Sequence, residues 1–61
     1  MYETIEEKAV KRIARIIGVR PSRVELNKIQ EEQGVDVAYF RYQGNNYKVA
    51  TAGEERITLL V

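Results

Sequence analysis

IARIIGVRPSRVELNKI, residues 13–29, decides which fold this chain adopts. The stretch begins with apolar residues at helical spacing, passes Gly18 and Pro21, and continues into a segment that fits either a second helix or a first strand. A second helix would make a helix-turn-helix, whereas a strand would make a helix packed on a sheet.

The segment before Gly18 predicts an amphipathic helix over residues 3–17. Glutamates in its first turns and Arg15 near its end match the helix macrodipole. Thr4 can cap the helix in place of Glu3, and Gly18 is a natural stop. The apolar side chains recur at helical spacing and form one broad stripe: Ile5, Ala9, Val10, Ile13, Ile16 and Ile17.

Residues 22–33 have features of a second helix. Ser22 and Glu25 fit the S-x-x-E capping box. The run at residues 28–33 is rich in helix-forming residues, and Gly34 could follow the helix end. Local propensity therefore favours a helix here.

The same region resembles the helix-turn-helix family over about 20 residues. Ala14, Gly18 and Val24 have the spacing of the small residue, the turn glycine and the later apolar residue of that family. Asn27 stands where the family has another apolar residue. The resemblance implies a helix-turn-helix followed by a β-hairpin and an edge strand.

Turn residues instead predict that this region enters a sheet. Three turns set the registers: Gly44-Asn45 as a two-residue turn, residues 32–34 as a three-residue loop with Gly34 left-handed, and residues 52–54 as another loop. These turns align apolar and aromatic side chains of four strands on one face, where they can receive the apolar stripe of the helix. The predicted rows are Val24–Tyr42–Tyr47–Leu59 and Leu26–Phe40–Val49–Ile57.

We give the strand interpretation precedence, because agreement between turns and side-chain rows outweighs local propensity. The predicted fold is α+β, with an N-terminal amphipathic helix packed on one face of an antiparallel β-meander of three to four strands. A chain of 61 residues forms a single domain over residues 1–61.

The amino-acid composition argues against several kinds of functional site. The sequence contains no cysteine and no histidine, so disulfides and thiolate or imidazole metal sites are not expected. No serine or threonine has an evident activating partner, and adjacent glutamate pairs lie in predicted loops. We therefore expect no enzyme activity and no cofactor. No apolar run approaches the ~18 residues of a membrane span, so no span is expected. The absence of cysteine suits a reducing compartment, and we expect a cytoplasmic protein.

Positive charge is concentrated in residues 8–28, where seven basic residues face Glu25 alone, a local net charge of +6. Four basic residues share one stripe of the predicted helix, where neighbouring like charges repel each other. A phosphate backbone or an acidic protein surface would neutralise such a stripe, although it could also be a solvated face paired with carboxylates from the sheet. The predicted nucleic-acid-binding residues, with weak sequence selectivity, are Lys8, Lys11, Arg12, Arg15, Arg20 and Arg23.

The opposite sheet face would have no helix over it. An exposed apolar patch there would mark an interface, and the final strand RITLLV, residues 56–61, would lie at a sheet edge that can pair with another chain. The alternative function is therefore a protein-interaction module, such as a small regulator or inhibitor, and a homodimer is expected. The predicted partner-interface residues are Ile29, Val37, Tyr39, Arg41, Lys48 and Leu60.

Overall fold

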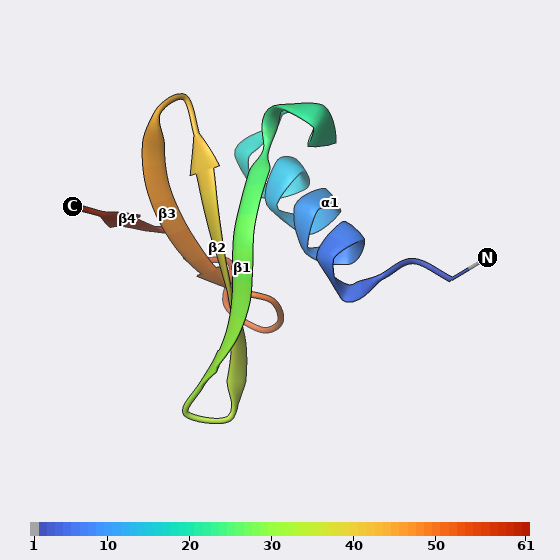
Figure 1. The fold of residues 1–61 in the computed structure, drawn as a ribbon, viewed down its shortest axis with the longest axis vertical. Coiled ribbons are helices and arrows are strands. Elements are labelled where there is room, and N and C mark those ends of the chain that lie inside the picture. Colours follow the sequence, from blue (N-terminus) through green and yellow to red (C-terminus); the bar gives the residue numbers. More distant parts are fainter. Residues whose placement is uncertain (1) are drawn as a thin grey trace.

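A computed structural model, which describes residues 2–61, places one helix against a four-stranded antiparallel sheet with the strand order β1-β2-β3-β4 (Figure 1). The predicted α+β fold is confirmed, and the helix-turn-helix alternative is not needed. The elements in chain order are α1 (Ile5–Ile17), a single 3-10 turn η1 (Pro21–Arg23), β1 (Glu25–Glu32), β2 (Val35–Tyr42), β3 (Asn45–Ala50) and β4 (Thr58–Leu60).

Helix α1 is bounded by two local signals. The Thr4 hydroxyl accepts a hydrogen bond from the Glu7 backbone N–H at 3.1 Å, and the Glu7 carboxylate accepts one from the Thr4 N–H. This capping box starts the helix two residues later than predicted. At the other end Gly18 has φ +75° and donates its N–H to the Ala14 carbonyl. Glycine suits this left-handed position because it has no Cβ.

The chain leaves α1 through η1 rather than through a second helix. Pro21 begins the single turn, and the Val24 N–H closes it on the Pro21 carbonyl at 3.1 Å. The backbone is extended at Val24, and β1 begins at Glu25. The S-x-x-E pattern at Ser22 therefore caps no helix. As a strand, this region packs Leu26 and other apolar side chains against the core, which outweighs its helical propensity.

The β2–β3 turn differs from the prediction by one residue. The two turn residues are Gln43 and Gly44, both with positive φ, instead of Gly44-Asn45. A type I′ turn needs positive φ at both positions, and this placement puts glycine at the second of them. Each β3 partner is consequently displaced by two positions, so that Phe40 faces Tyr47 instead of Val49. A displacement by two keeps every side chain on its predicted face.

The β1–β2 connection is also a two-residue turn, Gln33-Gly34, rather than the predicted three-residue loop. A β-bulge between Leu26 and Lys28 compensates for the shorter turn, so Leu26 still faces Phe40 as predicted. Beyond the bulge the side chains change faces. Ile29 lies opposite Ala38 and packs against the core, so its predicted place on the open sheet face is wrong.

Strand β4 keeps the predicted register with a longer connection. Leu59 lies opposite Tyr47, but the chain between β3 and β4 spans residues 51–57 instead of a three-residue loop. Thr51 anchors the start of this loop, because its N–H and its hydroxyl both donate to the Asp36 carbonyl, at 2.9 and 3.1 Å.

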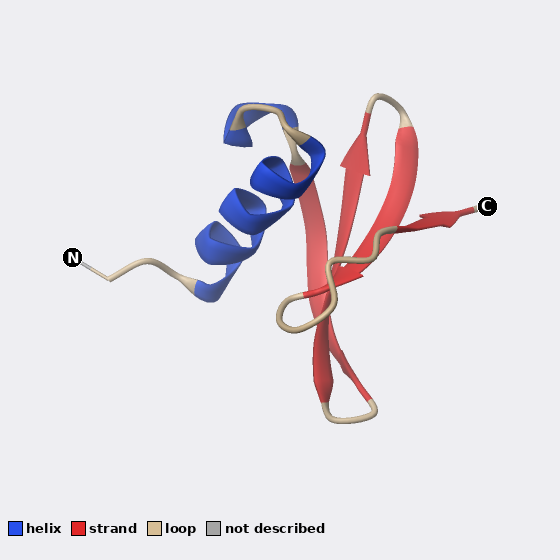
Figure 2. Cartoon of the chain, turned by 180° about the vertical axis from the view of Figure 1, so that it is seen from behind, coloured by secondary structure: helices blue, strands red, loops and turns tan. Residues whose placement is uncertain are grey.

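The core lies between α1 and the sheet, which form two layers with the 51–57 loop beside the helix (Figure 2). Phe40 and Ile13 are each 1% exposed and fill its centre. The Phe40 ring stacks on Tyr47 with 5.4 Å between centroids. The buried core residues are Ala9, Ile13, Ala14, Val24, Ala38, Phe40 and Val49.

Along residues 2–61 no helix is both long and apolar enough to cross a membrane.

Candidate nucleic-acid interface

Three of the four basic side chains predicted to share a stripe on α1 have partners within the chain. Lys11 forms an ion pair with Glu3, and the Arg15 Nη2 atom lies 3.8 Å from the carboxylate of Glu55. Within residues 2–61, Lys8 forms no ion pair or side-chain hydrogen bond. The stripe is therefore partly neutralised by the protein itself, although the Lys11 and Arg15 side chains remain largely exposed.

The Lys11–Glu3 ion pair shifts the pKa values of both side chains in the directions expected for opposite charges. The hydrogen bond and charge of Lys11 lower the pKa of Glu3, and those of Glu3 raise the pKa of Lys11. Both groups are at the surface, where salt screens such pairs. A phosphate can therefore compete with Glu3 for Lys11.

Arg12 has a structural contact rather than a free guanidinium. Its Nη2 atom donates to the Gly53 carbonyl at 3.1 Å, and its Nε atom is buried without a hydrogen-bond partner. The side chain thereby joins α1 to the loop before β4. Among the predicted nucleic-acid-binding residues, Arg12 is the one most engaged inside the fold.

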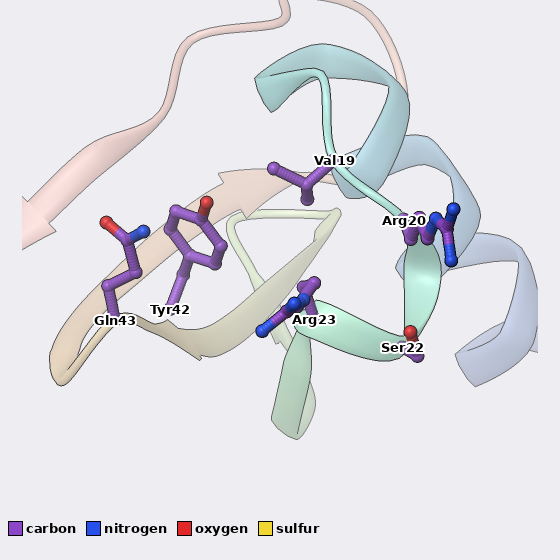
Figure 3. A pocket seen from close by; sticks show the side chains of 6 residues that line it. All are labelled: Val19, Arg20, Ser22, Arg23, Tyr42 and Gln43. Carbon is purple, nitrogen blue, oxygen red and sulfur yellow. The ribbon is translucent and has the colours of Figure 1, made fainter.

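Arg20 and Arg23 lie where α1 gives way to η1, and both are exposed. Neither forms an ion pair in the part of the chain that the structure describes. In Figure 3 the Arg23 side chain extends toward the side where Tyr42 and Gln43 lie, while Arg20 extends away from them. Together these residues line an open concavity between η1 and the β2–β3 turn. Its lining residues are Val19, Arg20, Ser22, Arg23, Tyr42 and Gln43 (Figure 3).

Backbone geometry places this concavity, which we call the Arg23–Tyr42 concavity. Gly18 ends the helix, and Pro21 holds φ in the range of the single turn that carries both arginines. On the other side, the Gln43-Gly44 turn ends β2 directly after Tyr42. Tyr42 is half-buried on the helix side of the sheet and packs against the core. Two arginine residues and an aromatic ring therefore border the same open space, and the Arg23 side chain is the one that extends toward the ring.

A second concavity follows the helix. It is also open, and it brings the α1 stripe together with Glu3 before the helix and Thr51 directly after β3. Its lining residues are Glu3, Lys8, Lys11, Arg12, Arg15 and Thr51. All six predicted nucleic-acid-binding residues thus line one of two concavities, four along α1 and two at η1.

Tyr42 and Gln43 were absent from the predicted site. The sequence predicted Tyr42 only as a member of an apolar row, beside Val24, and placed Gln43 directly before the predicted Gly44-Asn45 turn. The signal was nonetheless present, because the residue before Val24 is Arg23, and a row partner of Val24 must lie near it. The predicted pairing of Val24 with Tyr42, taken together with the position of Arg23 beside Val24, indicates that Tyr42 lies at the site.

The open sheet face carries a paired polar cluster around Tyr39. The ladder places Tyr39 between Lys28 and Lys48. The Lys28 Nζ atom lies 4.9 Å from the ring centroid, and the phenol donates a hydrogen bond to Glu32. Lys48 Nζ is 3.9 Å from the same carboxylate.

Of the other predicted partner-interface residues, Val37 and Leu60 are half-buried and Arg41 is exposed. All three lie on the open face, as predicted, whereas Ile29 does not. The largest exposed apolar side chains in residues 2–61 lie outside the predicted interface: Tyr2, Ile5, Val35, Leu59 and Val61.

The Tyr39–Glu32 hydrogen bond predicts a measurable pH dependence. The carboxylate acceptor raises the pKa of Tyr39, with burial and the negative charge of Glu32 acting in the same direction. The neutral phenol is therefore favoured in the folded protein. The hydrogen bond between Tyr39 and Glu32 contributes its full stabilisation below the ordinary tyrosine pKa of about 10. That stabilisation is lost as the pH rises through the raised pKa of Tyr39 in the folded protein.

Spectrophotometric titration of the folded protein tests this shift. Tyr39 is expected to ionise at higher pH in the wild type than in Glu32→Gln, which lacks the negative charge. Tyr39→Phe identifies the transition that belongs to Tyr39. Coincident Tyr39 transitions in the wild type and Glu32→Gln would contradict the hydrogen bond.

Neither concavity contains the ligands of a metal site, and residues 2–61 hold no group of three or more histidine, cysteine, aspartate or glutamate side chains placed to bind a metal ion. No protein-family model, curated protein or solved structure matches this chain. Fold and surface together define a small α+β domain in which six of the ten basic residues lie along α1 and around η1.

Proposed function

We propose that this protein is a small non-enzymatic domain that binds nucleic acid through the phosphate backbone. The observation that carries the proposal is the Arg23–Tyr42 concavity. Arg20 and Arg23 are exposed, have no acidic partner within the described chain, and border an open polar space that also contains an aromatic ring. Arginine donates in a planar fork that matches phosphate oxygens.

Single-stranded nucleic acid suits this surface better than a duplex. Nucleic-acid-binding helices that read a duplex enter the major groove, whereas η1 is one turn of three residues and α1 is held along the sheet. A flexible strand can bend into the concavity and bring its phosphates to both arginines. The ring of Tyr42 and the amide of Gln43 are then available to bases and sugars.

The expected binding is local and weakly selective for sequence. The whole chain has a formal net charge of only +1, so long-range attraction to a polyanion is small. Phosphate contacts carry no sequence information by themselves. The basic residues best placed to make them are Lys8, Arg20 and Arg23, which have no internal partner in the described chain, and Arg15, which remains largely exposed beside Glu55.

Fluorescence anisotropy with labelled single-stranded and duplex oligonucleotides tests the proposal. Four phosphate contacts to a single strand predict a slope of about −3 for log affinity against log salt. Affinity should then fall about 50-fold between about 50 mM and about 200 mM salt. Absence of binding at the lower salt, or an affinity that salt does not change, would remove the basis of the proposal.

A further inference from the structure

Strand β4 leaves one edge of the sheet open. It is the last strand in the order β1-β2-β3-β4, and within the described chain it pairs only with β3. The N–H and C=O groups along its outer side therefore have no strand partner. Such an edge is a template for another strand.

The side chains of this edge do nothing to prevent pairing. Residues 57–61, ITLLV, carry no charge, and Leu59 is 54% exposed although it is apolar. The residues that usually protect an edge are charged side chains, proline or a bulge. None of these occurs within the five residues.

The opposite edge of the sheet is protected in the usual way. Strand β1 has charged side chains at four of its eight positions and a β-bulge between Leu26 and Lys28. Since both devices hinder pairing, the two edges of the same sheet differ in their capacity to accept another strand. Strand β4 is therefore the edge better suited to accept another strand.

We propose that β4 pairs with β4 of a second copy of this chain, antiparallel and about a two-fold axis at Leu59. This register places Leu59 opposite Leu59 of the other copy and Ile57 opposite Val61. The strand alternation puts all three positions on the helix side of the sheet, as shown by the pairing of Leu59 with Tyr47 and the packing of Ile57 on the core. An eight-stranded sheet with both helices on one side results.

The sequence of β4 favours a second copy over an unrelated strand. A two-fold interface must be complementary to itself, and the apolar pattern at residues 57, 59 and 61 reads the same in both directions. The row Phe40–Tyr47–Leu59 continues directly into Leu59 of the second copy. With a net charge of +1 on each chain, repulsion between copies is small.

Complementary charges at position 59 test the proposal. In the proposed register the two side chains at this position are direct cross-strand neighbours, so like charges oppose each other. We expect the wild type to approach twice the chain mass of 7.1 kDa in sedimentation equilibrium as its concentration rises from about 10 µM to about 1 mM. Leu59→Lys and Leu59→Glu should each remain at the single-chain mass, whereas an equimolar mixture of the two should recover the double mass.

Val35→Lys is the matched control. Val35 is also apolar and exposed, but it lies at the β1–β2 turn, away from β4. This variant should associate like the wild type. Far-UV circular dichroism of each variant shows whether it is folded, and recovery in the mixture shows it independently.

The outcomes separate this proposal from the nucleic-acid proposal, because Arg20→Glu/Arg23→Glu should keep the double mass. A wild type that stays at the single-chain mass at every concentration would overturn the pairing of copies. Single-chain mass in the mixture of the two Leu59 variants would overturn the register at Leu59.

Discussion

Phe40→Ala is expected to remove much or all of the stability of this domain. Phe40 lies in β2 and is 1% exposed, and replacing a buried phenylalanine by alanine costs about 3–5 kcal/mol. Domains gain about 0.05–0.15 kcal/mol of stability per residue, which gives about 3–9 kcal/mol for a chain of this size. One core substitution therefore removes much or all of the free energy of unfolding.

Urea denaturation followed by far-UV circular dichroism measures this loss. Val35→Ala is the matched control, since Val35 belongs to the same strand but is 44% exposed, and its midpoint should remain close to that of the wild type. Equal midpoints for Phe40→Ala and Val35→Ala would show that Phe40 is not the centre of the core.

Arg20→Glu/Arg23→Glu is expected to weaken binding to a single-stranded oligonucleotide by at least about tenfold at low salt. Each arginine beside a phosphate contributes at least about 1 kcal/mol, the value for two unit charges about 4 Å apart in bulk water, and reversal of its charge adds repulsion. A change of about 1.4 kcal/mol is already tenfold in affinity. The slope of log affinity against log salt should also become shallower by about 1.4, because two contacts to a single strand are lost.

A matched variant separates the concavity from net charge. Both Arg20→Glu/Arg23→Glu and Lys28→Glu/Arg41→Glu replace two cations by two anions and change the formal net charge from +1 to −3. Lys28 and Arg41 are exposed on the open sheet face. We expect the open-face variant to bind several-fold more tightly than the concavity variant. Equal loss in both would mean that net charge, and not the concavity, determines binding.

The fold followed from turn chemistry and side-chain alternation. Leu26 faces Phe40 and Tyr47 faces Leu59 as predicted, because these pairs depend on which residues are apolar and on approximate loop lengths. The Gln43-Gly44 turn lies one residue from its predicted place. Its choice depends on left-handed backbone geometry at a glutamine, which the sequence does not specify uniquely.

The bulge in β1 was beyond sequence reasoning of this kind. Alternation assigned Ile29 to the open face, and only an extra residue near Asn27 turns it into the core. A bulge leaves no short motif, because its advantage is collective: it reconciles a tight turn at Gln33-Gly34 with the pairing of Leu26 and Phe40.

The candidate site was predicted in its charges but not in its contacts. The basic stripe on α1 was evident from helical spacing. Its internal partners were not, since Gly53 and Glu55 come from a loop whose course depends on the whole fold. Because these long-range contacts engage Arg12 and Arg15, Arg20 and Arg23 become the main candidates for phosphate binding.

The most direct test of the account is an NMR titration of the isotope-labelled wild type with a short single-stranded oligonucleotide at low salt. We expect the largest amide shifts at residues 19, 20, 22, 23, 42 and 43, around the Arg23–Tyr42 concavity, with smaller changes near Lys8 and Arg15. Shifts centred on the open face around Tyr39, or no shifts at saturating oligonucleotide, would contradict this expectation.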